Sequence, residues 1–130
     1  MKYGLINMKE KSLIVKKSFG FAVRIVKLYK YLIDIKKEFI LSKQLLRSGT
    51  SIGANIREAH SAESKADFVH KMGIAQKETD ETIYWLELLY NTEFLTQKEF
   101  ESIQMEAVEI LKIIKSIILT SKQNLKFHNS

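Results

Sequence analysis

The residues that could support catalysis or metal binding are few, and their spacing fits neither. The chain has three histidines and no cysteine, so thiol nucleophiles, zinc ribbons and disulfides are excluded. Asp67 and His70 are three residues apart, but a di-iron bundle needs two Glu-x-x-His pairs and two further glutamates. His60 and Glu63 run in the reverse order. Ser51 has Gly49 and Gly53 on either side, but it falls inside a predicted helix and shows no nucleophile elbow. We therefore expect no enzyme activity, no cofactor and no metal.

Basic side chains are the second set of residues with evident chemistry. Residues 1–47 contain 12 basic and 3 acidic side chains, whereas residues 48–95 contain 4 basic and 8 acidic ones. The whole chain has a formal net charge of +6 at pH 7. This asymmetry fits a polyanionic partner, copies of the chain that meet through unlike faces, or simply a charged, solvated surface.

Five of these cations fall on one side of a predicted helix, and a tyrosine lies beside them. At about 100° per residue they occupy an arc of roughly 140°, opposite the apolar side chains. Such an arc binds phosphates, and an aromatic ring stacks on an unpaired base. The candidate nucleic-acid-binding residues are Lys16, Lys17, Arg24, Lys27, Lys30 and Tyr31.

The elements that must position these residues are helices. Proline is absent and glycine occurs only 5 times in 130 residues, which favours long uninterrupted helices. Hydrophobic periodicity predicts helices over about residues 12–35, 39–62, 64–92 and 96–121, with a frayed tail over 122–130. Short linkers make neighbouring helices antiparallel, so we predict one all-α domain over residues 1–130, an up-down-up-down four-helix bundle.

Local signals predict where these helices begin and which sides face the core. Ser64 followed by Asp67, and Thr96 followed by Glu99, are start signals of the third and fourth helices. No glycine or proline marks the first turn, which a change of apolar phase places near residues 36–38. The first helix is predicted to centre its apolar stripe on Phe19, Ala22, Val26, Tyr29 and Ile33, flanked by Phe21, Ile25, Leu28 and Leu32.

Two glycines inside the second helix need a physical reason, because each costs about 1 kcal/mol relative to alanine. Gly49 and Gly53 form a lane of small residues with Ser42. Such a lane lets another helix, or a phosphate, approach the backbone closely. The strand-loop-helix context of a phosphate-binding loop is missing, so we favour a helix contact and keep a phosphate groove as the alternative.

The third helix carries apolar side chains on two opposite sides. One side has the spacing of a bundle seam, from Phe68 through Met72 and Ala75 to Leu86. The other side implies either a central position in the bundle or a contact with another subunit, and we favour the subunit contact. The candidate oligomer-interface residues are His70, Ile74, Trp85 and Leu88.

Polar residues in the second and third helices form a further candidate group. Arg47 and Glu58 share one side of the second helix, three turns apart, too far to touch but able to line one groove. Asn55 lies at the edge of the apolar stripe, where its amide needs a partner. Glu78 and Glu81 of the third helix complete the group. These residues either form inter-helix salt bridges or contact a partner molecule.

A long segment of the chain has a sequence that is distinctive enough to compare with known protein families. Residues 41–89 read LSKQLLRSGTSIGANIREAHSAESKADFVHKMGIAQKETDETIYWLELL and follow the run FAVRIVKLYKYL. The segment resembles the four-helix-bundle proteins encoded in intervening sequences of bacterial 23S ribosomal RNA genes. The similarity covers about residues 18–120 and is most specific in RSGTSIGANIREA, KADFVHKM and E-T-x-x-W-L-x-L-L. The fold is also similar to that of the accessory protein of diversity-generating retroelements, a pentamer that works with a reverse transcriptase.

This resemblance implies a bundle that assembles into a ring, with a pentamer as the expected state, and a basic surface for RNA or DNA. The polar signature of the family falls here on Arg47, Ser51, Asn55, Glu58, Lys65, Asp67 and Glu78. The resemblance does not make the protein a ribosomal subunit.

Charge pattern and resemblance together predict a non-enzymatic, homo-oligomeric accessory protein that binds RNA or DNA mainly through a basic helix face. The alternative is a protein–protein interaction scaffold that docks a reverse transcriptase or a ribosome-associated partner. No window approaches the roughly 18 apolar residues of a membrane span, and residues 1–11 lack the apolar core of a secretory signal. We therefore expect no membrane contact and a cytoplasmic location.

Overall fold

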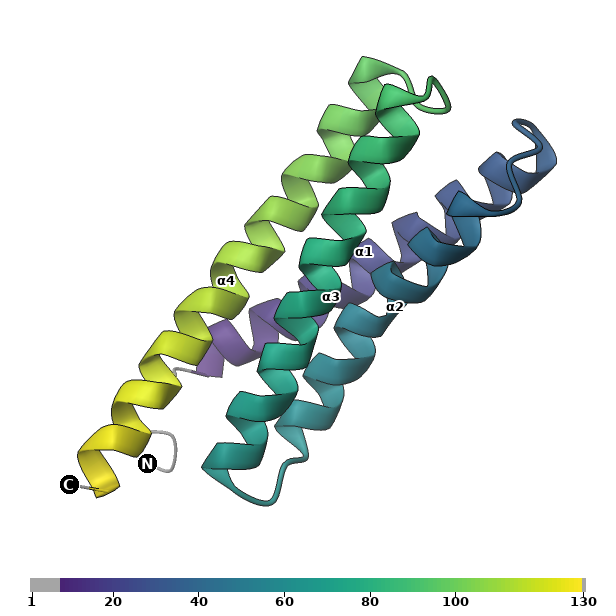
Figure 1. Cartoon of the computed structure of the whole chain (residues 1–130). Helices are drawn as coiled ribbons and strands as arrows, with labels where there is room; N and C mark the ends of the chain where they lie inside the picture. The colour runs from purple at the N-terminus through teal and green to yellow at the C-terminus, as the bar shows by residue number, and fades with distance from the viewer. Residues whose placement is uncertain (1–7, 130) are drawn as a thin grey trace.

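The chain folds into four helices that run up, down, up and down beside one another (Figure 1). The computed structural model describes residues 8–129, with side chains described for most positions between 9 and 124. The helices are α1 (Met8–Asp34), α2 (Leu41–His60), α3 (Lys65–Asn91) and α4 (Gln97–Asn129). The described residues contain no strand, so the predicted all-α four-helix bundle is confirmed. Residues 1–7 and 130 of the predicted domain lie outside this description.

Both predicted start signals cap their helices. The hydroxyl of Ser64 accepts the backbone N–H of Asp67 at 3.0 Å. The Thr96 hydroxyl accepts the N–H of Glu99 at 3.2 Å, and the Glu99 carboxylate accepts the N–H of Thr96 at 2.9 Å. These reciprocal bonds satisfy backbone donors that have no partner inside the helix, which is why α4 begins here.

The turn between α1 and α2 is held by a carboxylate rather than by glycine or proline. Lys37 adopts a positive φ of 55°, and Glu38 turns its buried side chain back over the start of α2. The Glu38 carboxylate accepts the backbone N–H groups of Ile40, Leu41 and Ser42 at 3.1, 3.0 and 2.6 Å. Glu38 thus replaces the side-chain cap that Ile40 cannot provide.

The core side of α1 differs from the predicted stripe. Phe19 is 56% exposed, and the other four stripe residues are half-buried. The buried side lies about 100° away, one residue step around the helix, because α2 and α4 cover the flank of the stripe instead of its centre. This buried side consists of Ile14, Ser18, Phe21, Ile25 and Leu32.

Close packing of α1 against α2 depends on a glycine. A Cβ atom at Gly49 would lie 2.8 and 2.9 Å from the two γ carbons of Ile25. A Cβ atom at Gly53 would lie 3.5 Å from the backbone oxygen of Ser18, an ordinary contact distance. The favoured explanation, a helix contact, therefore accounts for Gly49, whereas a methyl group fits at Gly53.

The last helix is longer than predicted. α4 continues to Asn129, whereas periodicity predicted its end near residue 121 and a frayed tail. Ser121 and Asn124 are buried and extend the core side of Ile114 and Ile117 at helical spacing. The extension was missed because its inward residues are polar. No helix within residues 8–129 combines the length and the apolar character that crossing a membrane requires.

Candidate nucleic-acid interface

The predicted basic residues follow α1 along the side that faces α4 and the solvent. Their positions result from the helix period, because the buried side is occupied by Phe21, Ile25 and Leu32. Lys16, Lys27 and Lys30 are exposed, while Lys17, Arg24 and Tyr31 are half-buried. The six residues therefore share one helix but not one environment.

Two of the five cations form ion pairs with α4. Lys17 binds the carboxylate of Glu109, and Arg24 binds the carboxylate of Glu106. Arg24 also donates to the hydroxyl of Ser102 at 3.1 Å. These pairs join the first helix to the last, and the sequence analysis did not predict them. Glu106 and Glu109 are three residues apart on one side of α4, which is the signal that could have indicated an acidic edge.

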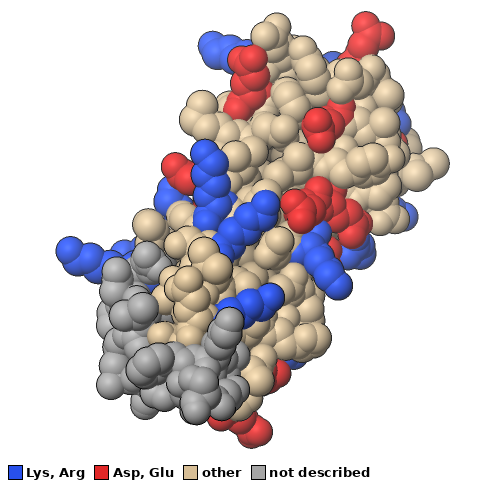
Figure 2. Space-filling model, turned by 60° about the vertical axis from the view of Figure 1, so that its left-hand side comes forward, with Lys and Arg blue, Asp and Glu red and all other residues tan. Residues whose placement is uncertain are grey.

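The other three cations have no acidic partner among the side chains that the structure describes. Lys16, Lys27 and Lys30 are exposed, and none of the ion pairs between described side chains involves them. Figure 2 shows one face of the molecule, on which basic and acidic side chains lie next to one another across the middle. The basic surface is therefore a set of separate unpaired lysines and not a continuous positive strip.

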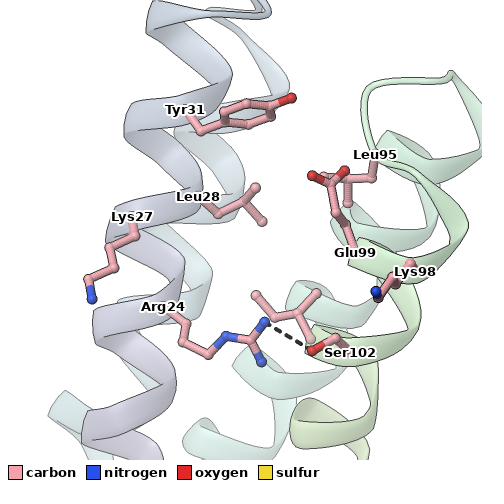
Figure 3. A pocket seen from close by; sticks show the side chains of 9 residues that line it. Arg24, Lys27, Leu28, Tyr31, Leu95, Lys98, Glu99 and Ser102 are labelled. Atoms are coloured by element: carbon pink, nitrogen blue, oxygen red, sulfur yellow. Dashed lines mark hydrogen bonds between the residues drawn. The ribbon is translucent and has the colours of Figure 1, made fainter.

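Tyr31 lies at a cleft between α1 and α4. The cavity has a volume of about 430 Å³. In Figure 3 the Tyr31 ring projects from α1 across one end of it, and Arg24 reaches toward Ser102 at the other end. The amine of Lys36 lies 6.0 Å from the centre of the Tyr31 ring. Lys98 on the α4 side of this cleft was not singled out by the sequence analysis.

The polar residues of α2 and α3 make a network between these two helices. Arg47 binds Glu78 at 3.2 Å and also binds Glu81. Glu81 accepts the indole N–H of Trp85 at 3.0 Å. The hydrogen bond that Arg47 donates to Glu81 and the charge of Glu78 raise the pKa of Arg47. The hydrogen bonds that Trp85 and Arg47 donate to Glu81 lower the pKa of Glu81. Salt bridging between helices, one of the two alternatives, describes this group.

The remaining residues of the predicted polar signature are spread along the same side. Glu58 binds Lys71 of α3 at 3.0 Å, which raises the pKa of Lys71. Asn55 donates its amide to the backbone oxygen of Ser51 at 2.9 Å, and Ser51 donates to the backbone oxygen of Arg47 at 2.6 Å. Arg47 and Glu58 each pair with α3 instead of lining a shared groove. The last two signature residues, at the start of α3, are Lys65 and Asp67.

The predicted oligomer-interface residues differ in their burial. His70 is exposed, whereas Ile74, Trp85 and Leu88 are half-buried. Trp85 packs against the core of its own chain and is held by Glu81. Tyr84, next to it, is 56% exposed and contacts the indole edge to face, with ring centres 4.9 Å apart. The back of α3 is therefore partly covered by its own bundle.

His60 and Ser51 each bond to a backbone oxygen of their own helix. Ring atom Nδ1 of His60 lies 2.7 Å from the backbone oxygen of Ile56, and the ring contacts Phe68 edge to face. Among the described side chains, no three His, Asp or Glu residues are grouped so that they could hold a metal ion.

Comparison with known proteins adds a family and a related structure. The family model of the 23S rRNA-intervening sequence proteins matches residues 10–116. One similar solved structure is a protein with unknown function from the S23 ribosomal protein family of Bacteroides thetaiotaomicron VPI-5482. It is 57% identical in sequence, with a TM-score of 0.83, and the alignment covers 84% of this chain and 97% of that chain. No curated protein matches the chain significantly.

Proposed function

Because this chain belongs to the family of 23S rRNA-intervening sequence proteins, we propose that it is a non-enzymatic accessory protein that binds RNA or DNA as a homo-oligomer. Its main contacts are electrostatic and come from α1. The observation that carries the proposal is the group of three exposed lysines, Lys16, Lys27 and Lys30, without acidic partners among the described side chains. The fold and the cysteine-free sequence fit a reducing compartment such as the cytoplasm.

The ion pairs of α1 change how many phosphates each subunit contacts. Lys17 and Arg24 are already neutralised by Glu109 and Glu106, so they add little to phosphate binding. With three free lysines per subunit, the logarithm of the binding constant should fall against the logarithm of the salt concentration with a slope of about −2 to −3. A ring of subunits multiplies these contacts and steepens the slope. Binding of this kind follows the backbone and carries little sequence preference.

The test is a titration of a labelled RNA or DNA oligonucleotide in rising salt. Replacement of Lys16, Lys27 and Lys30 by glutamine is expected to remove most of the salt dependence. Lys17→Gln is the matched control on the same helix, because Lys17 is already paired with Glu109. Affinity that does not respond to salt, or a triple variant that binds like the wild type, would defeat the proposal.

Substitutions on α4 test the same idea in the opposite direction. The double variant Glu106→Gln and Glu109→Gln leaves Lys17 and Arg24 without their carboxylates and is expected to bind more tightly, with a steeper salt slope. The exposed pairs contribute only about 0–1 kcal/mol each to stability, so the variant should remain folded.

Assembly into an oligomer is supported by apolar side chains that the bundle leaves exposed. Phe19 on α1, Tyr84 on α3 and Met105 and Leu119 on α4 are 56%, 56%, 70% and 61% exposed. A second copy of the chain that covers some of these residues would remove them from water. The ring and its expected pentameric state remain part of the proposal.

A protein–protein scaffold is the second candidate, and one surface favours it. Ile35, Phe39 and Ile40 at the α1–α2 turn are 66%, 54% and 76% exposed and lie next to Lys36 and Lys37. An apolar tip bordered by cations suits an acidic protein surface, as in a reverse transcriptase or a ribosome-associated partner. A complex with such a partner that survives nuclease treatment, and is lost on Phe39→Ser, would favour this function over nucleic-acid binding.

A further inference from the structure

The cleft between α1 and α4 has the chemistry of a binding site. Towards the end where α4 begins, α1 and α4 separate (Figure 1), and a cavity lies between their side chains (Figure 3). The cavity measures about 430 Å³, within the usual range for small-ligand sites. It is lined by Arg24, Lys27, Leu28 and Tyr31 on α1, and by Leu95, Lys98, Glu99, Ser102 and Ile103 on the side of α4.

The floor of the cleft is apolar and its edges are charged. Leu95 and Ile103 are only 4% and 3% exposed, and Leu28 is half-buried beside them. Lys27 and Lys98 are exposed, one on each of the two helices. The Lys27 amine points away from the cleft (Figure 3), so a flat ring can lie on the floor while a negative group stays beside Lys98.

The two ends of the cleft differ in polarity. Arg24 lies at one end, where it bonds to Ser102 at 3.1 Å and keeps 41% of its side chain exposed. Tyr31 and Glu99 lie at the other end (Figure 3). Arg24 and Tyr31 are seven residues apart on one helix, which is about 10.5 Å. This length accommodates one nucleotide, with its base toward Tyr31 and Glu99 and its phosphate beside Lys98.

We propose that this cleft binds one unpaired nucleotide of a single-stranded nucleic acid, stacked on Tyr31 and held at its phosphate by Lys98. Glu99 accepts an N–H from the base edge, since only one of its oxygens is needed to bond to the N–H of Thr96. The inference rests on the proposed function and makes it more specific. A base inside a duplex is stacked and paired, so it cannot enter the cleft without being flipped out.

The experiment compares single-stranded and double-stranded RNA of the same sequence by fluorescence anisotropy with the full-length protein. Tyr31→Ala is expected to weaken binding of the single strand about 5- to 150-fold and to leave duplex binding unchanged. Tyr31→Phe keeps the ring and should bind like the wild type.

A second pair of variants tests the cleft without changing its floor. Lys98→Glu is expected to weaken single-strand binding more than Lys115→Glu, which changes another exposed lysine of the same helix. Because Lys98 is exposed, this variant keeps the hydrophobic core intact, and circular dichroism checks that its helices are retained. Equal losses from Lys98→Glu and Lys115→Glu would contradict a role of the cleft.

The outcomes separate this inference from the function on which it rests. If the wild type binds both RNAs in a salt-dependent way but Tyr31→Ala weakens neither, or both equally, the cleft is not a nucleotide site and the proposed function stands. If the wild type binds neither RNA even at low salt, the proposed function is wrong, and this inference with it.

Discussion

Among single side chains, Glu38 has the largest influence on how the chain turns. It accepts three backbone N–H groups at the start of α2 and lies in a turn without glycine or proline. Burial raises the pKa of Glu38, but the hydrogen bonds from Leu41, Ser42 and Ile40 outweigh it, and the net pKa is below the usual 4.5. The charged form is thus the one that the folded protein stabilises.

Glu38 makes the stability of the bundle depend on pH. Because its pKa is lower in the folded state than in the unfolded state, its stabilising contribution is complete above about pH 5. It is lost as the pH falls below 4.5 toward the folded-state pKa. We expect Glu38→Gln to lower the free energy of unfolding at pH 7 by about 1–2 kcal/mol.

Urea unfolding at pH 7 and at pH 3.5 measures this effect. The difference between wild type and Glu38→Gln should shrink at the lower pH. Glu63→Gln, in the exposed α2–α3 turn, is the control and should unfold like the wild type at both values. An equal loss of stability from Glu38→Gln at both pH values would show that the negative charge is not what caps α2.

Between helices, Gly49 lets α2 approach α1 closely. A methyl group at this position would lie 2.8 and 2.9 Å from carbons of Ile25, a fully buried side chain. Gly53, one turn further along, leaves 3.5 Å to the nearest atom. Alanine at each of these two glycines therefore distinguishes the effect of helix propensity on stability from the effect of packing against α1.

We expect opposite effects of the two substitutions. Gly49→Ala should lower the free energy of unfolding by about 1–2 kcal/mol, because overpacking against Ile25 exceeds the gain in helix propensity. Gly53→Ala should raise the free energy of unfolding by up to about 1 kcal/mol, since only the propensity changes. Thermal or urea unfolding measures both.

A double-mutant cycle identifies the contact responsible. In an Ile25→Ala background, space is available and Gly49→Ala should become neutral or stabilising. If Gly49→Ala remains equally destabilising without the Ile25 side chain, the close approach to Ile25 is not the reason that glycine occurs here.

For the molecule as a whole, the proposed oligomer depends on which apolar side chains a second copy would cover. Three apolar or aromatic positions on the back of α3, Ile74, Trp85 and Leu88, were predicted to form a subunit contact, but Trp85 packs on the core of its own chain. Substitution of Trp85 would therefore disturb the fold as well as any interface. Ile74 and Leu88 test the interface more cleanly.

We expect light scattering to give the wild type a mass that is a multiple of 15.1 kDa. Ile74→Ser together with Leu88→Ser should yield a smaller particle, because polar groups at a subunit contact remove its apolar area. Phe19→Ser, which changes an exposed side chain of α1, is the variant for comparison. A monomeric wild type at micromolar concentration would contradict assembly, and a size change only in Phe19→Ser would move the interface to α1.

Much of the architecture was predictable because it depends on short-range patterns. The four helices, the antiparallel order and the caps at Ser64 and Thr96 depend on residues within a few positions of each other. The predicted end of α4 was wrong because Ser121 and Asn124, which face inward, are polar. Periodicity detects apolar residues, so a buried side made of polar ones leaves no signal.

The candidate site was less predictable. The positions of the α1 cations along one helix followed from the period, and so did their separation from the buried residues. Their pairing did not, because Lys17 and Glu109 are 92 residues apart in the sequence, and Arg24 and Glu106 are 82 apart. The cleft beside Tyr31 also depends on the separation of α1 and α4, which local spacing does not encode.

The sequence by itself therefore determined the helices, their caps and the type of side chain that each one presents, because these properties follow from neighbours within one or two turns. The tertiary structure decided which side of α1 is buried, which glycine allows close contact, and which cations stay free. Those properties are set by how two helices approach in space, and the energy of that approach comes from side chains distant in the sequence.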